Sequence, residues 1–245
     1  TSGKGYLTIN GGTVQATAYA DAFHSSQTLT INGGDIHIQT TCPASNSNSG
    51  SWGGFPGGGG DGNSDQTDIS AKGLKAGCTD NNNDTIEGNI TIAGGTITID
   101  STDDSIHATN ITMTGGTVTA ATGDDGIHAD NKLDIQAGTV TITKSYEGLE
   151  AADLQINGGN IHVNASDDGL NAAGGSDNSG NNGSWGGGGW GGGMSSSTGT
   201  LTINDGYLVV RAEGDGLDSN GDLIINGGTV LVYGSTSGGN GIFDK

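Results

Sequence analysis

Acidic residues recur at one place in this sequence, shortly before an aliphatic residue. They are Asp103-Asp104, Asp124-Asp125, Glu147, Asp167-Asp168 and Asp215. Another polar side chain comes directly after the aliphatic residue, at His107, His128, Glu150, Asn171 and Asp218. Carboxylate and amide oxygens are the ligands that hard cations such as Ca²⁺ take from proteins. The pattern therefore predicts a cation site, provided that the fold brings these residues together.

The sequence repeats itself every 21 or 22 residues. Gly pairs mark the repeat at Gly11-Gly12, Gly33-Gly34, Gly94-Gly95, Gly115-Gly116, Gly158-Gly159 and Gly227-Gly228, with weaker copies at Ala137-Gly138 and Asp205-Gly206. Apolar and polar residues alternate on both sides of each pair, which is typical of strands. A fixed period in this range predicts a solenoid, whose units bury their apolar faces against their neighbours.

We therefore predict an all-β fold, a right-handed parallel β-helix of about eight coils that forms a single domain over residues 1–245. Three short strands per coil would direct three apolar columns inward, and parallel strands joined by crossovers are almost always right-handed. Three excursions leave the helix, at 41–70, 77–88 and 174–199, and the first and last are Gly-rich.

The excursions contain the three tryptophans, and the two cysteines flank the first excursion. Trp52, Trp185 and Trp190 could stack on sugar rings, or they could anchor the Gly-rich loops to the flank of the solenoid. Cys42 and Cys78 flank the first excursion and could form a disulfide, with two buried thiols as the alternative.

In a β-helix, equivalent residues of adjacent coils stack about 4.8 Å apart, where two carboxylates repel by roughly 3 kcal/mol. Such a row needs a cation or raised pKa values, and we predict calcium. Turn chemistry is the alternative, because Asp can satisfy backbone N–H groups. The candidate ligands are Asp103, Asp104, Asp124, Asp125, Glu147, Glu150, Asp167, Asp168, Asn171, Asp215 and Asp218.

His107 and His128 stack in the same predicted row. Two imidazoles could bind a transition metal. We instead expect them to hydrogen-bond to the neighbouring carboxylates, and we group them with the three tryptophans as candidate carbohydrate-binding residues.

The charge balance limits the partners. With 7 basic and 27 acidic residues, the net charge is −20, which argues against nucleic acid or an anionic membrane as a partner. No run of 18 apolar residues is present, so we expect no membrane insertion.

Several motifs resemble a known family. They are Asp103-Asp104-Ser105-Ile106-His107, Asp124-Asp125-Gly126-Ile127-His128-Ala129-Asp130, Lys144 to Glu150, Asp167 to Gly175 with the following Gly-rich loop, and Gly214 to Gly221. In this order they resemble the carbohydrate-binding β-helix proteins of cellulose-degrading clostridia, formerly a domain of unknown function and similar to polysaccharide lyases. The likeness runs from Lys72 to Lys245; the first two coils, the Trp-Gly loop at 51–60 and the cysteines depart from it.

The resemblance implies a right-handed β-helix, secretion or cell-surface display, bound calcium, and affinity for cellulose or acidic, pectin-like polysaccharides. It does not assign the calcium ligands. We therefore expect a non-catalytic, calcium-binding extracellular carbohydrate-binding protein.

Two alternatives remain open. A calcium-dependent polysaccharide lyase would need a basic residue as general base. Lys144 is the best placed of the seven, but its acidic neighbours favour the charged ammonium, which cannot accept a proton. A surface layer or filament could instead form by end-to-end stacking of β-helices through open strand edges.

Overall fold

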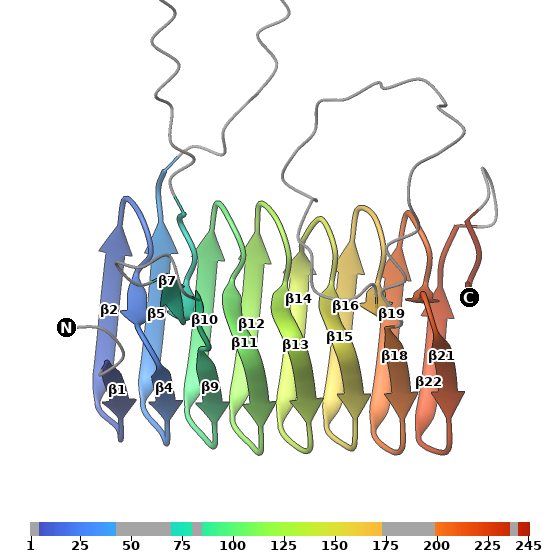
Figure 1. The fold of residues 1–245 in the computed structure, drawn as a ribbon, viewed down its shortest axis with the longest axis horizontal. Helices are drawn as coiled ribbons and strands as arrows, with labels where there is room; N and C mark the ends of the chain where they lie inside the picture. The colour runs from blue at the N-terminus through green and yellow to red at the C-terminus, as the bar shows by residue number, and fades with distance from the viewer. Residues whose placement is uncertain (1–4, 43–69, 80–84, 173–198, 236–239) are drawn as a thin grey trace, which may run out of the picture.

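The computed structural model describes residues 5–42, 70–79, 85–172, 199–235 and 240–245. Within these ranges the protein is all-β, and two long sheets of parallel strands lie side by side along one axis (Figure 1). None of the described residues forms a helix long and apolar enough to cross a membrane.

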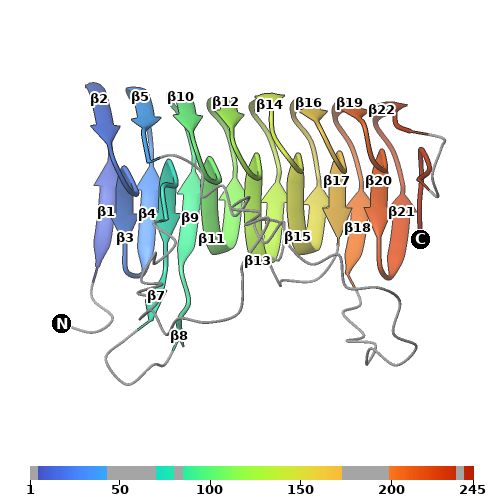
Figure 2. The ribbon, with the colours of Figure 1, turned by 90° about the horizontal axis from the view of Figure 1, so that it is seen from above.

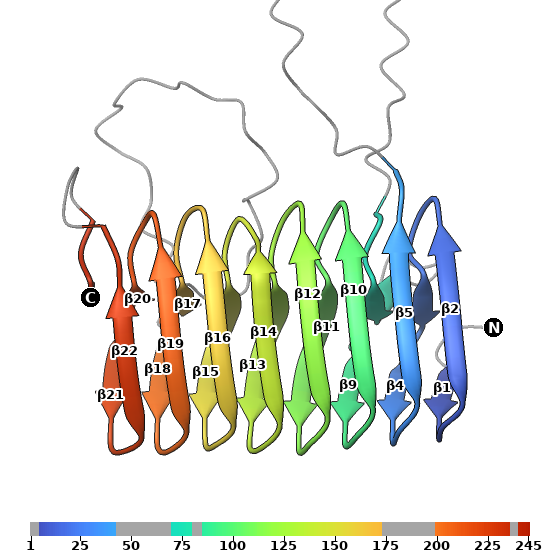
Figure 3. The ribbon, with the colours of Figure 1, turned by 180° about the vertical axis from the view of Figure 1, so that it is seen from behind.

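The sheet seen in front in Figure 3 has eight strands among the described residues. In spatial order these are β2 (Thr13–Ala18), β5 (Asp35–Thr40), β10 (Thr96–Ser101), β12 (Thr117–Thr122), β14 (Thr139–Lys144), β16 (Asn160–Ala165), β19 (Tyr207–Ala212) and β22 (Thr229–Tyr233). We call it the outer sheet. Figure 2 shows its strands and those of the second sheet in two rows along the long axis.

The second sheet has twelve strands in the described part of the chain. They are β1 (Tyr6–Ile9), β3 (Phe23–Ser25), β4 (Thr28–Ile31), β6 (Leu74–Ala76), β9 (Asn89–Ile92), β11 (Ile106–Met113), β13 (Ile127–Ile135), β15 (Leu149–Ile156), β17 (Leu170–Ala172), β18 (Thr200–Ile203), β20 (Leu217–Ser219) and β21 (Asp222–Ile225). A short antiparallel pair, β7 (Cys78–Thr79) and β8 (Thr85–Ile86), lies within the predicted excursion at 77–88.

Each strand pairs in register with the equivalent strand of the next repeat. Ile97 pairs with Val118 in the outer sheet, and Ile106 pairs with Ile127 in the second sheet. Equivalent side chains therefore stack in rows along the molecule, as the 21- or 22-residue period predicts.

The prediction of three separate strands per repeat is wrong for the three middle repeats. There the third strand and the next first strand merge into the long strands β11, β13 and β15, with irregular register after Ala108 and after Ala129. The strands stay separate where residues 77–88 or 174–199 are inserted between them. They are also separate between β3 and β4 and between β20 and β21, where no excursion is inserted. In the last repeat the sequence pattern predicts that Ile242 continues the column of Leu217. In the structure Phe243 pairs with Leu217 instead.

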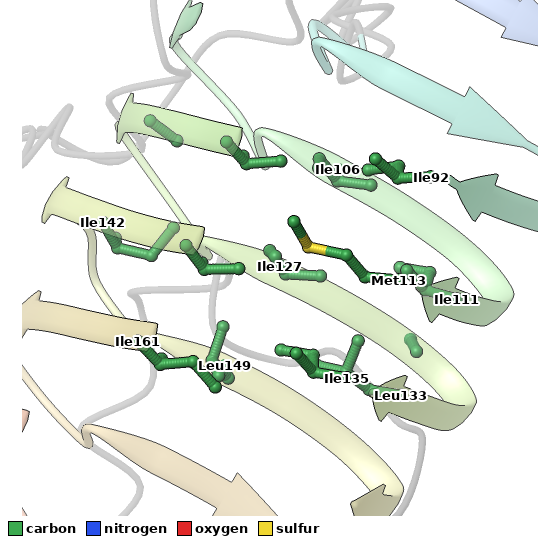
Figure 4. Packing of buried hydrophobic residues seen from close by; sticks show 14 of the residues in the cluster. Ile92, Ile106, Ile111, Met113, Ile127, Leu133, Ile135, Ile142, Leu149 and Ile161 are labelled. Atoms are coloured by element: carbon green, nitrogen blue, oxygen red, sulfur yellow. The ribbon is translucent and has the colours of Figure 1, made fainter. Parts of the chain in front are cut away.

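The apolar columns fill the space between the sheets. Ile106, Ile127 and Leu149 lie one above another and are almost completely buried (Figure 4). The terminal repeats are less well covered, and Ile225 is 45% exposed although its equivalents Ile135 and Ile156 are fully buried. The core therefore depends on both neighbours of each repeat.

The column that contains Ile106, Ile127 and Leu149 is the third apolar column of the repeat, and a row of small residues directly precedes it. A Cβ on Gly126 would lie 2.3 Å from the Gly148 carbonyl oxygen, and a Cβ on Gly148 would lie 2.2 Å from the Gly169 oxygen. The backbones of successive repeats approach closely at these glycines, whereas Ser105 in the same row has a side chain whose hydroxyl donates to the Gly126 carbonyl oxygen.

We expect Gly148→Ala to destabilise the protein by about 1–3 kcal/mol, because the added methyl group would overlap the next repeat. Gly11→Ala is the matched control, since its Cβ would meet no atom within 4 Å. The control should change stability by less than about 0.5 kcal/mol. Equal midpoints for the two variants in denaturant unfolding would contradict this account of the packing.

Candidate functional site

The predicted acidic residues form two in-register rows beside the third apolar column. The inner row holds Asp21, Lys72, Asp104, Asp125, Glu147, Asp168 and Asp215, two residues before the column. The next row, directly after the column, holds His24, Lys75, His107, His128, Glu150, Asn171 and Asp218, each paired with its neighbour in the sheet. The structure thus brings together most of the residues that the sequence selected.

The aspartates of the inner row use one carboxylate oxygen to join successive repeats. Oδ1 of Asp104 accepts the backbone N–H of Asp125 at 3.1 Å, and Oδ1 of Asp125 accepts that of Glu147 at 3.2 Å. Asp168 does the same with the N–H of Asp215 at 2.6 Å. The turn chemistry considered as an alternative is therefore present, and it occupies one oxygen of each of these carboxylates.

Lys72 neutralises one end of the inner row. Its ammonium is 3.0 Å from Asp103 Oδ1 and also contacts Asp104 Oδ2, and its side chain is only 8% exposed. Burial opposes its charge, but the two carboxylates outweigh burial and raise the pKa of Lys72 above its usual value. The sequence pattern did not indicate Lys72 as a site residue, although Lys72 occupies a position at which most repeats have an acidic residue.

His128 is a second positive group within the rows. Its side chain is fully buried, and Nδ1 lies 3.4 Å from Asp125 Oδ2 and 3.4 Å from Glu150 Oε2. Burial by itself would lower the pKa of His128, but these two carboxylates outweigh burial and raise it to about 10. The expected hydrogen bond to a carboxylate is present for His107, whose Nε2 lies 3.1 Å from Asp130 Oδ1. The ring nitrogens of His128 lie near carboxylates but have no hydrogen-bond partner among the described residues.

Asp125, Glu147 and Glu150 form what we call the buried acidic cluster. One oxygen of each lies within 4.8 Å of the others, and none of the three residues is more than 9% exposed. Burial, together with the charges of Asp125 and Glu150, raises the pKa of Glu147 from 4.5 to about 9. Ionisation of all three carboxylates at once is therefore unfavourable.

Asn171 adds an amide to this cluster. Its Nδ2 donates to Glu147 Oε2 at 2.8 Å, while its buried Oδ1 has no hydrogen-bond partner among the described residues. A buried acceptor without a partner costs about 1–3 kcal/mol. Three carboxylates from adjacent repeats are a ligand set that suits a hard cation, and Asn171 would add an oxygen if its amide turned Oδ1 in place of Nδ2 toward Glu147.

A second acidic group, Asp168, Asp215 and Asp218, is only half-buried. One oxygen of each again lies within 4.8 Å of the others. Burial and the neighbouring carboxylates raise the pKa of Asp168 to about 6 and also raise the pKa of Asp218. This open acidic cluster can be reached from solvent, unlike the buried one.

The remaining predicted ligands differ in their surroundings. Asp103, Asp104 and Asp124 also bring oxygens within 4.8 Å of one another, but Lys72 already pairs with the first two. Asp167 lies outside these groups and accepts a hydrogen bond from the hydroxyl of Tyr146. Lys144, the candidate base, is exposed at the end of β14 and forms no ion pair with a described residue.

The predicted disulfide between Cys42 and Cys78 is not formed in this structure. Cys42 follows β5, where its backbone N–H donates to the Tyr19 carbonyl, whereas Cys78 Sγ lies 3.8 Å from the Ser26 carbonyl oxygen. Tyr19 and Ser26 lie on either side of β3, so the two cysteines pack against different parts of the same repeat.

Trp52, Trp185 and Trp190 lie outside the described residues. In the described part, two exposed tyrosines lie on strands of the outer sheet. Tyr207 is 43% exposed and its ring centroid is 6.0 Å from that of His162, and Tyr233 is 55% exposed beneath Arg211, whose Cζ is 5.1 Å from the ring centroid. We call the surface formed by His162, Tyr207, Arg211 and Tyr233 the aromatic face. The sequence indicates it, because each of these residues occupies an outward position in a strand whose side chains alternate between core and solvent.

These observations describe an all-β protein of two stacked parallel sheets, with rows of acidic residues inside and an aromatic face outside. The model of a family described as carbohydrate-binding domain-containing protein matches residues 1–126 and 124–242. The chain belongs to this family. No curated protein and no solved structure matches it.

We expect Lys72→Met to destabilise the protein by about 3–5 kcal/mol, because Asp104 would remain buried without its cation. Lys132→Met is the matched control, since Lys132 is 3.6 Å from Asp153 and both side chains are 38% exposed. The control should lose less than about 1 kcal/mol. Thermal unfolding of both variants at low salt measures the difference, and a similar loss in both would refute the assigned role of Lys72.

The raised pKa values also predict how stability depends on pH in the presence of chelator. Unfolded Glu147 loses its proton near pH 4.5 and the folded form near pH 9, so its contribution to stability falls as pH rises between these values. The contribution of His128 falls in the same direction between pH 6.5 and about 10. Each group changes stability by at most about 1.4 kcal/mol per pH unit.

The melting temperature should therefore fall from pH 5 to pH 9. Glu147→Gln should make this decline shallower, whereas Glu213→Gln, at an exposed glutamate, should leave it unchanged. Parallel pH profiles for wild type and Glu147→Gln would contradict the raised pKa of Glu147.

Proposed function

We propose that this protein is a non-catalytic, calcium-binding carbohydrate-binding protein that acts outside the cell or at its surface, and that it recognises cellulose, acidic pectin-like polysaccharides, or both. We also infer that its repeats wind as a right-handed parallel β-helix. Family membership supports the carbohydrate-binding role. The in-register pairing of equivalent residues supports the helical winding.

The observation that carries the calcium proposal is the buried acidic cluster with Asn171. Calcium takes six to eight oxygen ligands and tolerates irregular geometry. Asp125, Glu147 and Glu150 supply carboxylates, and Asn171 Oδ1 is a buried acceptor that lacks a partner among the described residues. An ion there would replace the proton that Glu147 otherwise retains and would link adjacent repeats.

The buried cluster is too enclosed to hold a polysaccharide directly. The open acidic cluster offers a better place for an ion that bridges to the ligand, since Asp168, Asp215 and Asp218 are all partly exposed. A calcium ion bound there would keep coordination positions for water or for the carboxylate of a uronic acid.

The aromatic face supports recognition of the polysaccharide itself. A tyrosine ring can pack against the apolar face of a pyranose. Tyr207 and Tyr233 are exposed on the adjacent strands β19 and β22, where Tyr207 pairs with Thr229 and Tyr233 pairs with Arg211. Arg211, the one arginine in the chain, lies over Tyr233 and can form paired hydrogen bonds with a sugar carboxylate.

The test combines calorimetric calcium titration with binding to polygalacturonate and to cellulose, each with calcium and with chelator. We expect Glu147→Gln to weaken calcium binding and Asp168→Asn to weaken calcium-dependent binding to polygalacturonate. Tyr207→Ala combined with Tyr233→Ala should lower polysaccharide affinity at least roughly tenfold, whereas Tyr6→Ala, at an exposed tyrosine of the second sheet, should not.

Absence of polysaccharide binding by the wild type, or equal binding by the double tyrosine variant, would overturn the assigned face. An unchanged calcium titration for Glu147→Gln would overturn the assigned ion site. Ultraviolet absorbance from unsaturated sugar products in the same samples would show a lyase, and Lys144→Ala would then test the candidate base.

A further inference from the structure

Two histidines and an aspartate bring three ligand atoms together beside the acidic rows. Asp130 Oδ1 lies 3.1 Å from Nε2 of His107 and 3.9 Å from Nε2 of His128. Tetrahedral zinc with bonds of about 2.0–2.1 Å separates its ligand atoms by roughly 3.3 Å. The two distances bracket this separation. Because the Nε2 lone pair lies in the ring plane and the two rings stack, one imidazole would have to rotate for both nitrogens to bind the same ion.

Each imidazole also has a carboxylate near its other nitrogen. His107 and His128 are register partners on β11 and β13, and their rings stack with centroids 4.7 Å apart and planes inclined by 18°. Nδ1 of His107 faces Asp104, and Nδ1 of His128 faces Asp125, each at 3.4 Å. A carboxylate at Nδ1 is the arrangement that orients Nε2 of a histidine toward a metal.

An independent observation points to a missing ligand. His128 is fully buried, and its Nε2 has no hydrogen-bond partner among the described residues. Buried polar nitrogens rarely lack a hydrogen-bond partner, because no interaction then compensates for the lost contact with water. The surrounding carboxylates favour a positive charge at this position, and a bound ion would supply it in place of the proton on Nε2 of His128.

Two of the three residues, His107 and Asp130, have access to solvent, whereas His128 is fully buried. His107 and Asp130 line a hollow of about 300 Å³, together with His24, Lys75 and Thr109. Zinc sites that act on exogenous ligands have three protein ligands and keep a fourth position open. The hollow lies where such an open position would be needed.

We propose that His107, His128 and Asp130 form a second cation site, specific for a divalent transition ion such as zinc, with its open position toward the hollow. Two imidazole nitrogens suit zinc or a similar ion, whereas calcium prefers oxygen ligands alone. The site therefore differs in ligand chemistry from the buried acidic cluster, and it does not depend on the proposed calcium or carbohydrate binding.

The test is a titration of the metal-free full chain with Co²⁺, followed by visible absorbance, and with Zn²⁺, followed by calorimetry. We expect one ion per chain and the intense visible bands of four-coordinate cobalt. His107→Gln and Asp130→Asn should each weaken binding on the order of 100-fold. Both residues are partly exposed, so these variants should fold even if His128→Gln does not.

His162→Gln, at the outer sheet, is the matched control and should bind as the wild type does. Calcium titration should be unchanged in His107→Gln and Asp130→Asn. Failure of the wild type to bind either ion would overturn the proposal, as would equal affinity in Asp130→Asn and His162→Gln. Loss of zinc binding in Glu147→Gln with retention in Asp130→Asn would place the ion in the buried acidic cluster instead.

Discussion

In-register pairing of equivalent residues is the constraint on which the whole structure depends. It places like side chains about 4.8 Å apart along the molecule. For apolar residues this builds continuous columns, and for asparagine it builds ladders such as Asn226 to Asn204 to Asn157, each with a hydrogen bond of 2.7 Å. For carboxylates the same stacking is unfavourable, so the acidic rows require compensation.

The compensation differs from repeat to repeat. Aspartates give one oxygen to the backbone of the next repeat, Lys72 pairs with Asp103 and Asp104, and His128 carries a charge between Asp125 and Glu150. Glu147 instead keeps its proton to about pH 9. These local differences within one repeated pattern are what create candidate sites for ions of different chemistry.

The acidic rows and the aromatic face have separate roles in the proposed function. The acidic rows lie mostly inside, where an ion would link repeats and stiffen the stack. The aromatic face on the outer sheet is flat and exposed, and it offers ring stacking and one guanidinium to a polysaccharide. Family membership places the carbohydrate-binding role on this chain without assigning the residues that perform it.

The sequence by itself determined the repeat, the apolar columns and the acidic rows, because strand periodicity and a fixed repeat length force equivalent residues into register. It did not predict the merged middle strands, the ion pair of Lys72, or the separation of Cys42 from Cys78. These depend on where insertions interrupt the stack and on contacts between residues distant in sequence. Burial, which separates the buried acidic cluster from the open one, was likewise decided only by the tertiary structure.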